Sequence, residues 1–341
     1  FTVPGASLSA AGTTIVSVIP THRRQGIMSK MMKAHLEDTR ERNEAITALW
    51  ASEAEIYGRF GFGMASYFVT TKLPKEYASF RYNATGNVSY RIIDLEEEAE
   101  LLVPLHEAIC KQRPGAFSSS STWWKHRVLA DPEFRRGGGC KLRCVVLEGD
   151  TGAEGYALYR VHAHGGHMEF NNELKVVEII GPTPQQEKLL WQYLFGVDLI
   201  RTISAWNLPV DHLLKWWLSD PRKLQSQLND SLWLRIVDVS KALSSRRYLD
   251  RGELVLEIHD QLCPWNTGRF LLTVDSDGQA SCQKTTRDAM ITMDVRELGS
   301  LYLGGMSAYE LYRGGLLEGD AKYIEKLDSL LRWSLAPWCL E

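Results

Sequence analysis

Residues 14–36 constrain the fold most, because three patterns follow one another there in a fixed order. Residues 14–19 are apolar and mostly β-branched, which predicts a buried strand. Pro20 ends that strand, because proline cannot donate to a sheet ladder. A polar loop over residues 21–26 follows, and apolar residues then recur at helical spacing as far as Leu36. The stretch therefore predicts a strand, a basic glycine loop and an amphipathic helix.

The basic loop has the chemistry of an anion-binding site. A helix N-terminus presents up to four backbone N–H groups without partners, together with the positive end of the helix dipole. Gly26 has no Cβ, so the backbone can approach a ligand closely there, and Arg23 and Arg24 add charged, bidentate donors. Together they predict a cradle for a pyrophosphate. The alternative is a solvated basic loop before a helix, and the flanking strand and helix favour the cradle.

A second strand and a short helix follow. Residues 45–51 predict the strand. Ser52 as N-cap and Glu55 three positions later form a capping-box pattern, which predicts a short helix that ends near Gly61. Tyr57 lies just over one turn into that helix. From its residue type alone, Tyr57 is expected to be a packed aromatic side chain.

A second strand–loop–helix unit indicates an internal duplication. Residues 76–140 look largely helical and loop-like, and residues 143–161 predict two paired strands around a glycine turn. Residues 174–180 predict a further strand, with Thr183 as the cap and Pro184 as the first residue of the next helix. This second loop has no arginine, and Pro184 removes an amide. We therefore expect a structural copy without the anion chemistry.

A third region begins near residue 249. Residues 253–259 and 269–274 predict strands, and residues 275–278 are typical of a hairpin turn. Helices are expected around residues 295–303 and 321–333. No phosphate loop or nucleophile motif is present in this region.

Composition limits the classes of protein and partner. A length of 341 residues predicts two or three domains. The formal net charge of -3 does not favour nucleic acid or an anionic membrane as partner, and no apolar run approaches the roughly 18–20 residues that span a bilayer. Six cysteines without a pairing rhythm indicate free thiols in a cytoplasmic protein. Eleven tryptophans are compatible with large buried surfaces or subunit interfaces.

A histidine cluster offers an alternative metal site at His162, His164 and His167. The cluster lies between predicted strands beside two glycines, with no nearby cysteine and no obvious outer ligand shell. We expect a hairpin loop there and no bound metal.

The motifs resemble those of a known superfamily. Residues 16–28 resemble motif A of the GCN5-related N-acetyltransferases (GNAT), Q/R-x-x-G-x-G/A, with Met28 in place of the usual small last residue. Together with residues 51–63 they resemble the enhanced intracellular survival (Eis) acetyltransferases of actinobacteria. The match continues through residues 181–184 and 263–266 to residues 336–338, and so covers nearly the whole chain.

The resemblance implies an α+β chain of three domains. The expected order is a catalytic GNAT domain over residues 1–75, a second, degenerate GNAT-like domain over residues 76–240, and a sterol-carrier-protein (SCP2)-like domain over residues 241–341. In the family, a first strand and the helices that wall the acceptor pocket precede motif A, so we expect those elements to lie before Phe1.

The resemblance also implies which residues bind acetyl-CoA. In the family, backbone groups of motif A pair with the pantetheine arm as an added strand, the loop holds the pyrophosphate, and the end of the next strand flanks the thioester. The predicted cofactor-binding residues are Val16, Ser17, Val18, Arg23, Arg24, Gln25, Gly26, Ile27, Met28, Ser52 and Glu53.

Two catalytic residues follow from the same resemblance. Direct attack of an amine on a thioester forms an oxyanion and then expels a thiolate, and Tyr57 is predicted to protonate that thiolate. A backbone N–H near Val18 can stabilise the oxyanion. In the family the chain's terminal carboxylate is the general base, so Glu341 is predicted in that role, although family members end in phenylalanine.

The predicted function is acetyl transfer from acetyl-CoA to the amines of a small polycationic acceptor. By resemblance, the acceptors are aminoglycoside antibiotics and the assembly is a homohexamer in the cytoplasm. Two alternatives remain open: an N-acetyltransferase that acts on protein or peptide amines, and a non-catalytic lipid-binding scaffold.

Overall fold

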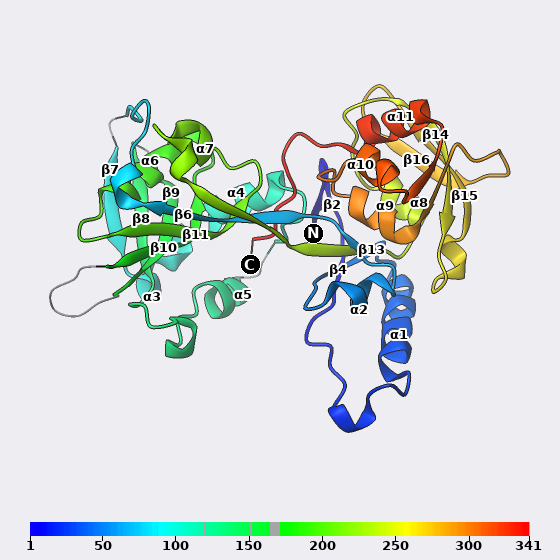
Figure 1. The fold of residues 1–341 in the computed structure, drawn as a ribbon, viewed down its shortest axis with the longest axis horizontal. Coiled ribbons are helices and arrows are strands. Elements are labelled where there is room, and N and C mark those ends of the chain that lie inside the picture. The colour runs from blue at the N-terminus through cyan, green and yellow to red at the C-terminus, as the bar shows by residue number, and fades with distance from the viewer. Residues whose placement is uncertain (87, 119–120, 151, 164–170, 341) are drawn as a thin grey trace. The chain divides into compact units, whose positions relative to one another are not determined.

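A computed structural model describes residues 1–341 except residues 87, 119–120, 151, 164–170 and 341 (Figure 1). The described residues form two compact units, each made of segments that are distant in sequence. The first unit consists of Phe1–Tyr67, Gln112–Phe117 and Asp230–Cys339. The second unit consists of Phe68–Lys111, Ser118–Asn229 and Leu340–Glu341.

The first unit contains a four-stranded sheet centred on β4 and β13. Its order is β3 (Ala11–Gly12), β4 (Ile46–Trp50), β13 (Leu232–Ile236) and β5 (Gly63–Met64). β4 runs parallel to β3 and antiparallel to β13, with Ile46 opposite Ile236. Helix α1 (Ile27–Glu41), labelled in Figure 1, lies between β3 and β4 along the chain. It buries Met32 and Leu36. The predicted helix after the basic loop and the strand over residues 45–51 are confirmed.

The rest of the first unit is a five-stranded sheet with four helices. The strand order is β16 (Ala280–Lys284), β15 (Gly268–Val274), β14 (Gly252–His259), β17 (Ile291–Asp294) and β18 (Leu317–Gly319). The helices are α8 (Val239–Ser244), α9 (Val295–Leu301), α10 (Ala308–Arg313) and α11 (Ala321–Leu331). A separate hairpin pairs β1 (Thr2–Val3) with β2 (Ala6–Ser7). The strands, the hairpin turn and the helices predicted after residue 249 are confirmed.

One apolar core serves both sheets of the first unit. Leu234 from the four-stranded sheet, Leu256 and Phe270 from the five-stranded sheet, and Leu298 from α9 belong to the same buried cluster. Because these side chains exclude water together, the two sheets are expected to fold as one cooperative body.

The second unit is a seven-stranded sheet. Its order is β12 (Gln225–Asp230), β6 (Tyr67–Pro74), β11 (Thr202–Pro209), β10 (Glu173–Ile180), β9 (Gly152–His162), β8 (Arg143–Gly149) and β7 (Ser89–Ile93). Its helices include α3 (Leu95–Glu98), α4 (Val103–Gln112), α5 (Ser121–Trp123), α6 (Pro184–Gly196) and α7 (Leu214–Trp217). β10 and β11 are parallel and joined by α6. The predicted second strand–loop–helix unit is thus present, and Thr183 caps α6 in a capping box with Gln186.

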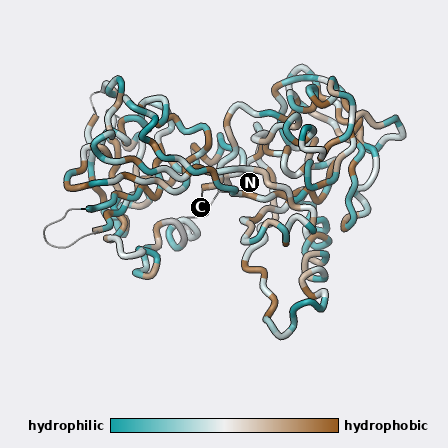
Figure 2. The backbone as a smooth tube through the Cα atoms, viewed as in Figure 1, coloured by the Kyte–Doolittle hydropathy of each residue, from teal (hydrophilic) through white to brown (hydrophobic). Residues whose placement is uncertain are grey.

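The prediction of a buried strand over residues 14–19 is wrong. Thr13 N–H donates to Ala48 at 3.0 Å, and the chain leaves the sheet after that bond. Ile15 has a φ of 52°, which a β-branched residue rarely adopts and which cannot continue a ladder. The side chain of Ile15 is 92% exposed. Figure 2 shows the resulting arm, residues 13–19, with apolar stretches outside any sheet.

The predicted Ser52 cap is also wrong. Helix α2 (Ala54–Gly58) begins one residue later than the capping box requires, and its N-cap is Glu53, which makes no side-chain capping bond. Ser52 therefore lies before the helix, with its side chain exposed. The helix also ends at Gly58, two residues before the predicted end near Phe60, and Gly61, with a φ of 78°, lies in the turn that follows. Strands that were not predicted include β7, β11, β12, β13, β17 and β18.

Candidate active site

A pocket of about 810 Å³ lies in the first unit, where the arm, the basic loop, α1 and α2 meet. The arm and the basic loop supply one wall, and the end of β4 with α2 supplies the other. Every predicted cofactor-binding residue except Gln25 lines this pocket, and so does Tyr57. The lining residues are Val16, Ser17, Val18, His22, Arg23, Arg24, Gly26, Ile27, Met28, Ser29, Ser52, Glu53, Ile56, Tyr57, Arg59 and Phe60.

The arm presents an open edge of backbone to the pocket. Within the described part of the chain, the N–H groups of Val16, Ser17 and Val18 donate no hydrogen bond. The Val18 carbonyl accepts a long bond from Arg23 Nε at 3.4 Å. An extended ligand can pair with such an edge as an added strand does, because backbone donors and acceptors alternate along it. The departure of the arm from the sheet, which contradicts the predicted strand, is what leaves these groups accessible.

The basic loop turns sharply to present the N-terminus of α1. Arg24 and Gly26 both have positive φ, 62° and 73°, and Gly26 is the N-cap of the helix. The first intrahelical bond runs from Lys30 N–H to the Gly26 carbonyl at 3.1 Å, so the preceding amides of the first turn face the pocket without helical partners. No acidic residue lies in that first turn. The loop is therefore positively charged and rich in donors, as an anion site requires.

Gly26 leaves room as well as conformational freedom. A Cβ placed at Gly26 would meet no protein atom within 4 Å. The free space lies beside the unpartnered amides, so the residues present fit a pyrophosphate group. A side chain at this position would occupy that space and would also hold φ in a region unfavourable to L-residues.

Tyr57 combines a packed ring with an unpartnered hydroxyl. The residue is only 7% exposed, and its ring meets Phe62 edge to face at a centroid distance of 6.1 Å. Met32, Leu49 and Trp233 belong to the same buried cluster. Within the described part of the chain, the Tyr57 hydroxyl makes no hydrogen bond. The ring is thus fixed by packing in a residue that lines the pocket.

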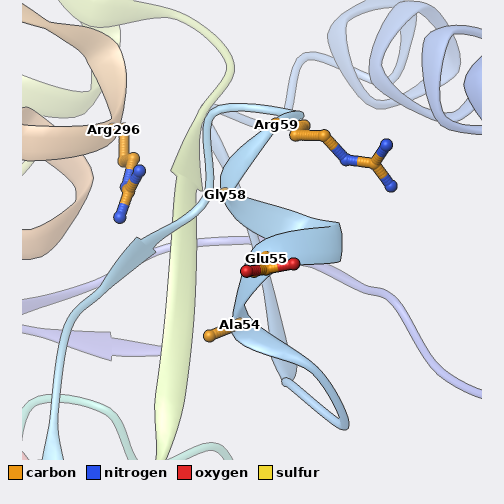
Figure 3. A pocket seen from close by; sticks show the side chains of 5 residues that line it. All are labelled: Ala54, Glu55, Gly58, Arg59 and Arg296. Carbon is orange, nitrogen blue, oxygen red and sulfur yellow. The ribbon is translucent and has the colours of Figure 1, made fainter.

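A second, smaller pocket of about 470 Å³ lies against another face of α2. It is lined by Ala54, Glu55, Gly58, Arg59 and Arg296 (Figure 3). Figure 3 shows Arg296 and Arg59 on opposite sides of α2, and a Cβ on Gly58 would lie 3.4 Å from the guanidinium carbon of Arg296. Arg59, which directly follows α2, lines both pockets. The second pocket therefore lies beside the predicted cofactor site, and its opposite wall is Arg296 of α9.

The segment before Glu341 packs against the strand that leads into the pocket. Trp50, the last residue of β4, donates its indole N–H to Cys339 Sγ at 3.4 Å. Trp338 N–H donates to the Pro114 carbonyl at 2.8 Å, and Trp338 and Cys339 are buried. Glu341 itself lies outside the described residues, so its predicted role as base stays a prediction.

The predicted histidine loop is only partly described. His162 is buried at the end of β9, whereas His164 and His167 lie outside the described residues. Among the residues that are described, no group of three or more His, Cys, Asp or Glu side chains could hold a metal ion. In the same part of the chain, no helix has the length and apolar character needed to cross a membrane.

The prediction from motifs missed five pocket residues. These are His22, Ser29, Ile56, Arg59 and Phe60. His22 lies in the basic loop and Ser29 in the first turn of α1, while the other three lie in α2 or directly after it. Their proximity in sequence to predicted residues was the available signal, but the side of α2 that faces the pocket could not be derived without the position of the arm.

Comparison with known proteins assigns the chain to a family. An acetyltransferase (GNAT) domain family matches residues 1–65, and another family of the same description matches residues 115–236. A sterol carrier protein domain family matches residues 239–340. An N-acetyltransferase of Streptomyces coelicolor is 35% identical over 340 residues, which cover 99% of this chain and 82% of that protein. The N-acetyltransferase Eis of Mycobacterium tuberculosis is 34% identical over 338 residues, which cover 96% of this chain and 79% of that protein.

Solved structures of related proteins have the same fold as this chain. The crystal structure of Eis1 from Mycobacterium abscessus has a TM-score of 0.85 at 29% identity and matches 99% of this chain and 83% of its own. A GCN5-related N-acetyltransferase from Anabaena variabilis shares the fold, with a TM-score of 0.85 at 19% identity.

Two GNAT domains followed by a sterol carrier protein domain define the chain as a tandem GCN5-related N-acetyltransferase, a class of enzyme that uses acetyl-CoA. Its extensive identity to the mycobacterial enzyme places it further: the chain belongs to the Eis family of N-acetyltransferases. The fold class and family predicted from the motifs are confirmed.

Proposed function

We propose that this enzyme transfers acetyl from acetyl-CoA to amines of a small polycationic acceptor, and that aminoglycosides are such acceptors. The observation that carries the proposal is the single pocket that brings together the arm, the anion-binding loop and the Tyr57 hydroxyl. Acetyl-CoA supplies an acetyl thioester when bound. The structural similarity to Eis1 and the sequence identity to the N-acetyltransferase Eis support an enzyme of this kind.

Binding is assigned to backbone groups and to the two arginines. Val16, Ser17 and Val18 would pair with the amide groups of the pantetheine arm. The amides from Gly26 to Met28 would hold the pyrophosphate, with Arg23 and Arg24 adding charge. Gln25 belongs to the same proposed set, because it lies between two residues that line the pocket. Ser52 and Glu53 would flank the thioester at the end of β4.

Proton transfer is assigned to Tyr57 and Glu341. Tyr57 lines the pocket and its hydroxyl has no partner among the described residues, so we assign to that hydroxyl the proton donated to the departing sulfur. A carboxylate at Glu341, in its side chain or at a chain terminus, would accept the proton of the attacking amine. The Trp50–Cys339 contact supports this assignment, because it holds the chain two residues before Glu341 against the strand that ends at the pocket.

We propose that the three domains span residues 1–75, 76–240 and 241–341 and that the second is not catalytic. In its loop, a Cβ on Gly181 would lie 2.2 Å from Glu187 N, so helix α6 itself fills the space that remains open at Gly26. Pro184 at the start of α6 also lacks an amide. The second loop therefore has neither room nor the full set of donors for a pyrophosphate.

The assembly and location are part of the same proposal. All six cysteines are free thiols, which suits the reducing cytoplasm. A homohexamer is proposed from the family resemblance, and sedimentation velocity tests it.

A thiol-release assay tests the function. Free CoA is measured with acetyl-CoA and, separately, kanamycin-type aminoglycosides, lysine peptides or lipid amines as acceptors. We expect turnover with aminoglycosides and a mass gain of one acetyl group or more on the acceptor. Arg24→Ala with Gly26→Asp should raise the KM for acetyl-CoA about tenfold or more, whereas Thr183→Ala in the second loop should leave kcat and KM unchanged. Turnover with peptides alone would replace the proposed acceptor class, and no acetyl-CoA binding would overturn the proposal.

A further inference from the structure

A fully buried arginine supports the turn that follows the Tyr57 helix. Arg235 lies on β13 with 0% exposure. Its Nε donates to the Phe60 carbonyl at 2.8 Å, and a terminal nitrogen donates to the Ile236 carbonyl at 2.7 Å. Phe60 is three residues after Tyr57, and its N–H donates to the Tyr57 carbonyl at 3.0 Å. Arg235 is therefore linked to Tyr57 through a single intervening residue.

Asp260, a residue of the sterol carrier domain, balances the charge of Arg235. The other terminal nitrogen of Arg235 donates to both oxygens of Asp260, at 2.7 and 2.8 Å. Asp260 follows β14 and also accepts from Cys263 N–H at 2.9 Å and from Asn266 Nδ2 at 3.0 Å. The pair is buried and hydrogen-bonded throughout. Removal of one partner leaves an uncompensated buried charge, which is strongly unfavourable.

Two glycines allow the turn after α2 to pack closely against β13 and α9. A Cβ on Gly61, which has a positive φ, would lie 2.8 Å from Arg235 Nε. A Cβ on Gly63 would lie 2.0 Å from the carbonyl oxygen of Arg296, on α9 of the sterol carrier domain. The turn has no space to shift towards β13 or α9. The position of α2, and of Tyr57 on it, is thus fixed from outside the first GNAT domain.

We propose that Arg235 and Asp260 are positioning residues for Tyr57, so that the sterol carrier domain is a working part of the active site. Arg235 holds the Phe60 carbonyl, and Asp260 holds the guanidinium in the orientation that this bond requires. Lysine cannot replace Arg235, because a single ammonium group does not reproduce the planar set of guanidinium donors. Displacement of a catalytic group by about 1 Å can cost roughly 100-fold in rate. The inference rests on the proposed role of Tyr57 as general acid.

The test compares two buried arginines of the first unit. Arg246 is also almost fully buried, but it donates to the carbonyls of Tyr302 and Leu331, and among the described residues it makes no hydrogen bond to α2. We therefore measure Arg235→Lys, with Arg246→Lys as the matched control and Asp260→Asn as a second route to the same loss. Rates are referred to active sites counted by acetyl-CoA titration, so partial unfolding does not enter kcat. Asp260→Glu, which keeps the charge, replaces either test variant if it fails to fold.

We expect Arg235→Lys and Asp260→Asn to lower kcat by about 10- to 100-fold. The KM for acetyl-CoA should stay within about threefold, and Arg246→Lys should keep wild-type kcat per active site. The same changes in a Tyr57→Phe background should lower kcat no further, because groups that act as a unit are not additive. The measurement in the Tyr57→Phe background is therefore the most specific test of the positioning role.

Each contrary result has a distinct meaning. Equal kcat losses in the wild-type and Tyr57→Phe backgrounds, or an equal loss in Arg246→Lys, would overturn the positioning role and leave the function in place. Wild-type kcat for Arg235→Lys and Asp260→Asn would do the same. Wild-type kcat in Tyr57→Phe alone would instead refute the proposed general acid.

Discussion

Tyr57→Phe should separate catalysis from stability. The ring, which packs against Phe62 and the cluster around Trp233, is kept in phenylalanine. The hydroxyl makes no hydrogen bond within the described part of the chain, so its removal leaves no buried partner unsatisfied. We expect the free energy of unfolding to change by no more than about 0.5 kcal/mol. Tyr57→Ala would be a poor test, because loss of a packed ring costs about 3–5 kcal/mol by itself.

The kinetic effect should be far larger. Loss of a general acid reduces kcat by roughly 10²–10⁴, which corresponds to about 2.7–5.4 kcal/mol of activation free energy. Turnover is measured by thiol release at saturating acetyl-CoA and acceptor, and unfolding by denaturant titration of the same samples.

Tyr302→Phe is the matched control in the same unit. Its hydroxyl donates to the Ala242 carbonyl at 3.0 Å in the buried core. That variant should lose about 1 kcal/mol of stability and keep kcat. The reasoning is refuted if Tyr57→Phe keeps wild-type turnover, or if its loss of turnover only parallels a loss of folded protein.

Three further predictions concern the pyrophosphate loop, a buried acid and the end of the chain. Arg24→Ala with Gly26→Asp should weaken acetyl-CoA binding about tenfold or more, measured by calorimetry, because a carboxylate would replace a charged donor; unchanged affinity in a folded protein would refute the cradle. Burial raises the pKa of Glu178 to about 7 from its usual 4.5, so the native carboxyl keeps its proton while the unfolded one ionises, and the free energy of unfolding should fall as pH rises from 4.5 to 7. The difference between wild type and Glu178→Gln in denaturant titrations should follow that slope, at most about 1.4 kcal/mol per pH unit, and a pH-independent difference would contradict it. Deleting Glu341, or appending residues to it, should lower kcat sharply while acetyl-CoA affinity is kept, and full turnover would assign the base elsewhere.

The local chemistry of the site could be read from the sequence because it lies in one short stretch. Arg24, Gly26 and the following amphipathic helix predict an anion-binding N-terminus, and α1 begins directly after Gly26. The helix start at Pro184 was predictable for the same reason, since its cap and its first residue are adjacent.

The remainder depends on contacts between distant residues. The apolar run over residues 14–19 has strand propensity, but the positive φ of Ile15 turns it out of the sheet. Propensity reports what a segment favours on average and not whether a neighbouring strand is there to pair with it. The Arg235–Asp260 pair left no pattern, because an arginine in a strand and an aspartate in a loop are ordinary on their own. Strand β11 was missed although it pairs with the predicted β10, and its second partner, β6, lies more than a hundred residues earlier.

The discontinuous first unit also governs how the enzyme is made. Strand β4 pairs with β13, with Ile46 opposite Ile236. The central pairing of this sheet therefore cannot form until Ile236 has been synthesised. At translation rates of about 5–20 residues per second, that interval is roughly 10–40 seconds. During it, the second unit can emerge and fold as an insertion, while β4 remains an apolar strand without its main partner. The nascent N-terminal segment therefore exposes β4 until β13 emerges, and the core that Ile46 shares with the five-stranded sheet closes only after the sterol carrier domain has left the ribosome.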